Sequence, residues 1–169
     1  MKIKYISFVV AFVLFSITAN SQSKLGTVNV NDILTHLPEL TEVETAMKTY
    51  RADLDKILNE KTVTYKSKVE LFKKNADTYS DIMKKTMGEE LYGLEDDIKK
   101  FQQNGVKLVQ IRQEELLRPL YAKISNMIAE VAKEQNYTQV LTIEGNEFAY
   151  IDEKLDITSI VKTRLGIKK

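Results

Sequence analysis

Residues 41–83 read TEVETAMKTYRADLDKILNEKTVTYKSKVELFKKNADTYSDIM, and they open a run from Glu39 to Asn136 whose pattern is helical throughout. Along this run apolar side chains recur every three or four residues, as they do on one face of a helix. The run holds one proline, Pro119, and three glycines, so little interrupts it. Because so narrow a stripe covers only one side of a helix, two such helices must bury it against each other. The sequence therefore predicts a long antiparallel hairpin of two helices.

The predicted turn of the hairpin lies near Gly88, because the apolar spacing loses phase between Lys84 and Glu90. The outgoing stripe consists of Val43, Met47, Tyr50, Leu54, Leu58, Thr62, Tyr65, Val69, Phe72, Ala76, Tyr79 and Met83. The returning stripe consists of Leu91, Leu94, Ile98, Phe101, Gly105, Leu108 and Ile111. Pro119 removes a backbone donor and clashes with the preceding turn, so it predicts a kink or a brief break in the returning helix.

Short strands are predicted on both sides of the hairpin. Leu25–Asn31 alternates apolar and polar residues, which places Val28 and Val30 on one face of a strand. Tyr137–Ile143 and Glu147–Ile151 form two further strands around a turn at Gly145. A last helix places Ile157, Ile160, Val161 and Leu165 inward and ends at Gly166. The predicted class is α+β and mostly helical, with the hairpin projecting from a small body that contains the strands.

The predicted boundaries divide one domain, residues 24–169, into a body (24–40 and 118–169) and a hairpin arm (41–117). A body of about seventy residues buries little core on its own, and its strand edges are open to pairing. Both difficulties disappear if several subunits join their sheets, so an oligomer is predicted. Its interface candidates are Val28, Val30, Val140, Ile143, Phe148 and Tyr150.

Residues 1–23 have the order of a cleaved export signal. Lys2 and Lys4 precede an uncharged apolar run, Tyr5–Ile17, and small or polar residues follow as far as Ser23. The apolar run is shorter than the roughly 20 residues that cross a bilayer. Without this segment the chain has 23 basic and 24 acidic residues, so no positive field favours nucleic acid. An exported chain without cysteine has no disulfides and is expected to be soluble outside the cytoplasm.

Catalytic and metal-binding patterns are missing from the sequence. The chain has one histidine, His36, and no cysteine, so histidine triads, cysteine nucleophiles and zinc clusters lack members. The glycines are scattered singly, which excludes a phosphate-binding loop. The pairs Asp96-Asp97 and Glu114-Glu115 are adjacent on a helix, so their carboxylates diverge. We expect no enzyme activity, no cofactor and no metal.

What the hairpin does offer is adaptable apolar surface. Aromatic and methionine side chains suit a binder of varied partners. The candidates are Tyr65, Phe72, Tyr79, Met83, Met87 and Tyr92. The alternative is that such side chains join the two helices, and this alternative is favoured for Leu54, Val69, Leu94 and Ile98. Near the expected tip, at Tyr79, Met83 and Met87, both interpretations stay open because packing partners run out there.

The two ends of the chain resemble the Skp/OmpH family of periplasmic chaperones. The resemblance rests on the opening strand with Asp32-Ile33-Leu34, on Leu117-Arg118-Pro119-Leu120, and on the segment from Ile124 to Tyr137. It continues into Val140-Leu141 and ends with Asp156 to Val161. The hairpin matches the family only in its pattern. The chain departs from the strongly basic family members, since only Lys66–Lys85 is rich in lysine.

The resemblance implies a homotrimer whose strands form a central body and whose hairpins, or tentacles, enclose a cavity. It implies an ATP-independent holdase that binds unfolded outer-membrane proteins and prevents their aggregation. Weak contact with a membrane surface stays an open alternative. The competing hypothesis is a secreted trimeric coiled-coil spacer or adaptor of the cell envelope that has no chaperone activity.

Overall fold

The computed structural model describes residues 23–146 and 148–167, and the predicted export signal lies outside them except for Ser23. Within these ranges the chain is mostly helical and carries one small sheet, which confirms the predicted fold class. The chain divides into two compact units. One consists of residues 37–122, and the other combines residues up to His36 with those from Lys123 onward. The predicted boundaries of arm and body, at 40/41 and 117/118, stay a prediction.

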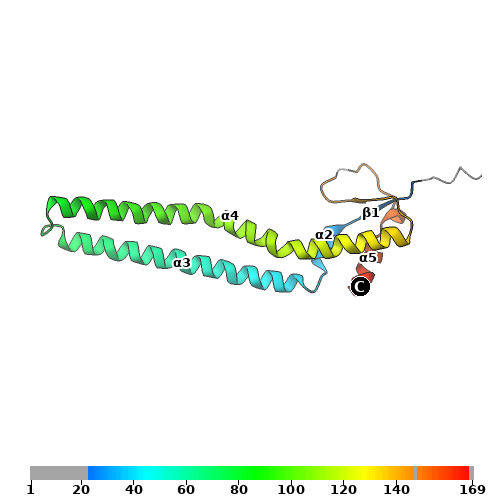
Figure 1. Ribbon diagram of the computed structural model, residues 1–169, viewed down its shortest axis with the longest axis horizontal. Coiled ribbons are helices and arrows are strands. Elements are labelled where there is room, and N and C mark those ends of the chain that lie inside the picture. Colours follow the sequence, from blue (N-terminus) through cyan, green and yellow to red (C-terminus); the bar gives the residue numbers. More distant parts are fainter. Residues whose placement is uncertain (1–22, 147, 168–169) are drawn as a thin grey trace, which may run out of the picture. The chain divides into compact units, whose positions relative to one another are not determined.

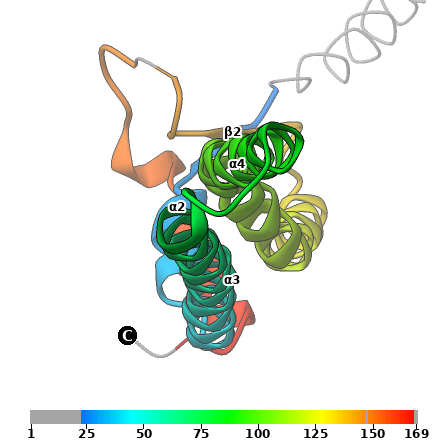
Figure 2. The same cartoon turned by 90° about the vertical axis from the view of Figure 1, so that its left-hand side faces the viewer.

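The unit of residues 37–122 is a hairpin of two helices. Helix α3 (Leu40–Asn75) runs outward and the first part of α4 (Asp81–Glu134) returns beside it, as Figure 1 and Figure 2 both show. Pro38 and Glu39 form the turn that precedes α3, and Glu42 lies near the positive end of the helix dipole. Helix α4 continues through Pro119, so the predicted break is wrong, while the predicted kink stays a prediction.

The turn of the hairpin lies at residues 76–80 and not at Gly88. Backbone N–H groups of Thr78 and Tyr79 donate to the carbonyl of Asn75 and close the end of α3. Ser80 Oγ then accepts from the backbone N–H of Met83 at 3.3 Å, as a side chain does at the start of a helix. Gly88 lies inside α4 and is exposed. The spacing of apolar residues changes near Gly88 because Met83 already belongs to the returning helix. The sequence prediction mistook this change for the turn.

The other unit contains a two-stranded parallel sheet. Strand β1 (Leu25–Val28) pairs with β2 (Gln139–Thr142), with Leu25 opposite Gln139 and Val28 opposite Thr142. Gly26 permits the ring of Tyr137 to lie over β1, because an added Cβ would meet that ring at 3.0 Å. The predicted antiparallel partner of β2 is wrong for residues 148–151, which are not in a strand; residue 147 lies outside the described residues. Thr27 instead forms a parallel bridge with Asp156.

Both ends of the chain and the last turns of α4 build the core of this unit. Helix α2 (Val30–Thr35) and helix α5 (Thr158–Arg164) follow the strands, with the short 3-10 helix η2 (Glu153–Leu155) before α5. The fully buried side chains here are Val28, Ile33, Ile124, Val131, Ile157 and Val161. Since the residues before α3 and those from Ile124 onward are at least ninety positions apart in the sequence, this core forms only when both ends of the chain come together.

Polar contacts fix the ends of the short helices. The Glu144 carboxylate accepts from the first N–H groups of α2, at 2.8 Å from Asn31 and 3.2 Å from Val30. Asp156 Oδ1 accepts from the Thr158 N–H at 2.8 Å, at the first residue of α5. Gly166, at φ +76°, and Asn136, at φ +59°, end α5 and α4 in the left-handed conformation. Gly166 therefore closes the last helix as predicted.

We expect Gly88→Ala to stabilise the protein by up to about 1 kcal/mol, because alanine is the better helix former at an exposed helix interior. No atom lies within 4 Å of the added Cβ, so no clash opposes this gain. Urea unfolding followed by circular dichroism measures the change. A marked loss of stability would contradict a helix at this position and would restore the turn.

Candidate functional site

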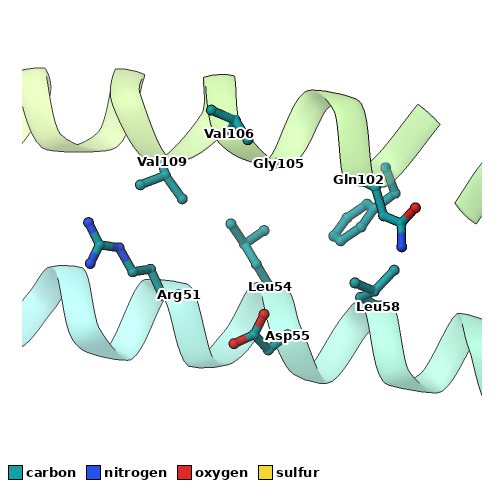
Figure 3. Close-up of a pocket in the computed structure, with 9 residues that line it drawn as sticks. Arg51, Leu54, Asp55, Leu58, Gln102, Gly105, Val106 and Val109 are labelled. Atoms are coloured by element: carbon teal, nitrogen blue, oxygen red, sulfur yellow. The ribbon is translucent and has the colours of Figure 1, made fainter. Parts of the chain in front are cut away.

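The seam of the hairpin contains a groove that apolar and polar side chains line. It lies between α3 and α4, has a volume of about 410 Å³ and is shown in Figure 3. Its lining residues are Arg51, Leu54, Asp55, Leu58, Phe101, Gln102, Gly105, Val106 and Val109. Leu54 projects from α3 between Gly105 and Val109 of α4. The stripes that hold the hairpin together therefore leave an apolar space between them.

The space exists because Gly105 occupies a stripe position without a side chain. An ideal Cβ on Gly105 would have no atom of another residue within 4 Å. Leu54 and Leu58 on the opposite helix are only half-buried, although they belong to the stripe. At one end of the groove the Phe101 ring lies 5.9 Å from Lys61 Nζ, so a cation of α3 covers this ring. Apolar surface thus stays accessible inside the seam.

Polar groups surround the groove. Arg51 and Asp55 are one turn apart on α3, and Gln102 projects from α4 toward Leu58, at the end of the groove away from Arg51. No ion pair joins Arg51 or Asp55 to another of the residues that the structure describes. The rim consequently carries one positive charge, one negative charge and one amide, so it can both donate and accept hydrogen bonds.

The end of the hairpin near the turn is held by its own side chains. The rings of Phe72 and Tyr79 lie 6.2 Å apart and are tilted by 44°, a geometry that favours aromatic contact. Lys68 of α3 and Glu90 of α4 form an ion pair across the seam. Farther along α4, a hydrogen bond from Lys100 to Asp96 raises the pKa of Lys100, but both groups are exposed.

The six predicted client-binding residues differ in how accessible they are. Tyr92 is 74% exposed and Met83 is 48% exposed, whereas Tyr65, Phe72, Tyr79 and Met87 are half-buried. None of the six lines the groove. Sequence reasoning missed Ile82, which is 80% exposed, and Val106, which is 74% exposed. It also missed the groove, although a glycine inside an apolar stripe was the signal that could have revealed it.

The predicted interface residues belong to the unit with the sheet. Val28 is 1% exposed and serves the core of its own chain, so it offers almost no surface to another subunit. Val30, Val140 and Ile143 are half-buried. Tyr150 is 82% exposed and Phe148 is 38% exposed, which leaves their rings available for contact.

The histidine of the chain lies among charged side chains at the end of α2. His36 lies in the turn after α2, where Nδ1 is 3.3 Å from the carboxylate of Asp32, and Lys162 Nζ is 2.7 Å from that carboxylate. Residues 23–146 and 148–167 hold no group of three or more side chains arranged to bind a metal. No helix within these ranges combines the length and the apolar character that a membrane span needs.

The sequence of residues 24–165 matches the family described as outer membrane protein (OmpH-like). The chain belongs to this family. The OmpH-like resemblance of its two ends is thereby confirmed. No curated protein matches the chain at a significant level.

Among solved structures, the crystal structure of a protein from Caulobacter crescentus CB15, described as an outer membrane chaperone (OmpH-like), has a similar fold. The TM-score is 0.66 at 15% sequence identity, and the match covers 87% of this chain and 86% of that one. At so low an identity the likeness establishes the shared OmpH-like architecture, and it transfers no binding residue from one chain to the other.

We expect Tyr79→Ser to destabilise the hairpin by about 1–3 kcal/mol, because it removes a half-buried ring that contacts Phe72. Tyr92→Ser removes the same side chain from an exposed position and should change stability by less than about 0.5 kcal/mol. Chemical unfolding of both variants measures the difference. Equal effects would contradict the aromatic closure of the turn.

Proposed function

We propose that this protein is an ATP-independent periplasmic holdase that binds unfolded outer-membrane proteins and prevents their aggregation. Membership of the OmpH-like family supports the proposal. So does the chaperone description of the structurally similar Caulobacter protein. The observation that carries it is the distribution of exposed apolar side chains, since most of the large ones lie on the hairpin. They include Ile57, Val63, Leu71, Ile82, Met83, Tyr92, Val106 and Ile111.

This distribution suits a client that is not yet folded. A strand of an outer-membrane barrel exposes apolar side chains toward lipid, and in water these must be shielded. Single apolar residues spaced along two helices offer many weak contacts instead of one deep site. Such contacts hold a client without trapping it, so no source of energy is needed for release.

A homotrimer is part of the proposal. The sheet of this chain has two strands among the described residues, and β2 pairs with β1 on one edge only. Leu141 is an exposed residue of β2, and the exposed rings of Phe148 and Tyr150 follow β2 closely in the sequence. Pairing of β2 with another subunit would satisfy its open edge and cover these side chains. The trimer would then enclose a cavity between its hairpins.

Positive steering of clients is not part of the proposal. The predicted exported chain has 23 basic and 24 acidic residues. Two of the six lysines between Lys66 and Lys85, Lys68 and Lys73, form ion pairs with Glu90 and Glu70. We therefore expect the affinity for clients to depend weakly on salt, as apolar contact does, and not to fall steeply with ionic strength.

We expect the exported form to suppress the aggregation of a urea-unfolded outer-membrane barrel protein that is diluted into buffer. Light scattering of the client should fall as the concentration of the chaperone approaches one trimer per client. Scattering that is unchanged at this ratio would refute the holdase and leave the spacer hypothesis. The mass of the protein alone, measured by light scattering, checks the trimer separately, and a mass of one chain would contradict it.

A further inference from the structure

We propose that the groove centred on Gly105 receives one large apolar side chain from an extended, uncharged segment of the client. The inference rests on the proposed function and assigns part of the binding to a defined place in the hairpin. It concerns the seam itself and not the exposed side chains on the outer faces of the helices.

The size and lining of the groove fit a leucine or phenylalanine side chain. Its volume is about 410 Å³, and Leu54, Leu58, Phe101 and Val109 supply apolar walls. An engineered cavity of about 150 Å³ with comparable walls binds benzene, so a ring needs less space than this groove provides. No side chain of the hairpin fills the place, because the Cβ position of Gly105 has no atom of another residue within 4 Å.

The rim of the groove fits the backbone on either side of such a residue. An extended chain presents N–H donors and C=O acceptors that need partners once water is displaced. Arg51 can donate, Asp55 can accept and Gln102 can do both, and all three line the groove. Because the charges of Arg51 and Asp55 cancel, a neutral segment is preferred over a strongly acidic or basic one.

The alternation of apolar and polar side chains along a barrel strand also fits the groove. Successive side chains of an extended segment point in opposite directions, and those of a barrel strand alternate between apolar and polar. One apolar side chain can therefore enter the seam while its two polar neighbours remain in water. A second helix packed on the groove would instead need a continuous apolar stripe, which the charged rim of Arg51 and Asp55 opposes.

The test is a substitution that places a side chain in the groove. Gly105→Leu should raise the thermal stability, because leucine is a better helix former than glycine and occupies the empty space. The same change should weaken client binding at least tenfold. Gly93→Leu is the matched control, since Gly93 also lies inside α4 with open space around its Cβ position, but it is exposed and does not line the groove. It should gain stability and keep the affinity of the wild type.

The probe is a capped seven-residue peptide of alternating threonine and serine with one central phenylalanine, titrated into wild-type protein with labelled leucine and valine methyl groups. We expect shifts at Leu54, Leu58 and Val109, and none with an alanine peptide. Unshifted methyl signals would overturn the proposal even if Gly105→Leu failed to fold. Binding of a dodecyl detergent below its micelle concentration at these methyl groups, without binding of the peptide, would overturn it in favour of a lipid chain.

The aggregation assay separates this inference from the proposed function. If the wild type and Gly105→Leu protect a client equally, the groove proposal is wrong and the holdase stands. If the wild type gives no protection but the peptide still shifts the groove methyl groups, the holdase is wrong and the groove stands as a peptide site.

Discussion

A hairpin of two helices can bury only the stripe along which the helices face each other, and every other feature of this unit follows from that limit. The seam between α3 and α4 is open to water on two sides, so even its stripe residues, such as Leu54 and Leu58, remain half-exposed. A globular core would hide such side chains completely. Here they stay within reach of a partner, and one missing side chain, at Gly105, is enough to create a groove.

The unit built from the two ends of the chain follows the opposite rule. Its segments meet from several directions, and six side chains, among them Ile33, Ile124 and Ile157, are fully buried. Helix caps and charged contacts, such as those of Glu144 with α2 and of Lys162 with Asp32, satisfy the polar groups at its margin. A closed core of this kind can keep one conformation while the hairpin offers accessible surface. One unit therefore closes around a buried core, whereas the hairpin leaves apolar side chains accessible.

Much of this architecture could be predicted from periodicity. The long helices, the strand Leu25–Val28, β2, the last helix and the αL residue at Gly166 were all expected. The first strand was predicted to reach Asn31, which is wrong, because Val30 and Asn31 belong to α2. The turn was misplaced because the returning stripe begins at Met83, before the exposed Gly88, and a glycine is also tolerated inside a helix. The parallel pairing of β1 with β2 could not be foreseen, because a register between segments more than a hundred residues apart leaves no local trace. Residues 148–151, Phe-Ala-Tyr-Ile, include side chains that favour strands and yet form no strand.

The binding surface was harder to predict than the fold. An apolar stripe residue looks the same in the sequence whether it packs between the two helices or is free to contact a client. Only the structure shows that Phe72 and Tyr79 contact each other while Tyr92 is exposed. The groove exists because Gly105 has no side chain, and a search for apolar residues does not detect a missing side chain. Charged rim residues such as Arg51 looked like ordinary solvated helix positions.

Photo-crosslinking to a bound client tests most directly whether the hairpin is the part that holds it. A benzoylphenylalanine can replace Val106, which is exposed beside the groove, or Glu130, which is exposed on the same helix in the other compact unit. With an unfolded outer-membrane barrel protein as the client, we predict strong crosslinks from position 106 and few from position 130. Equal or stronger crosslinking from position 130 would contradict the central claim that the hairpin, and not the unit with the closed core, holds the client.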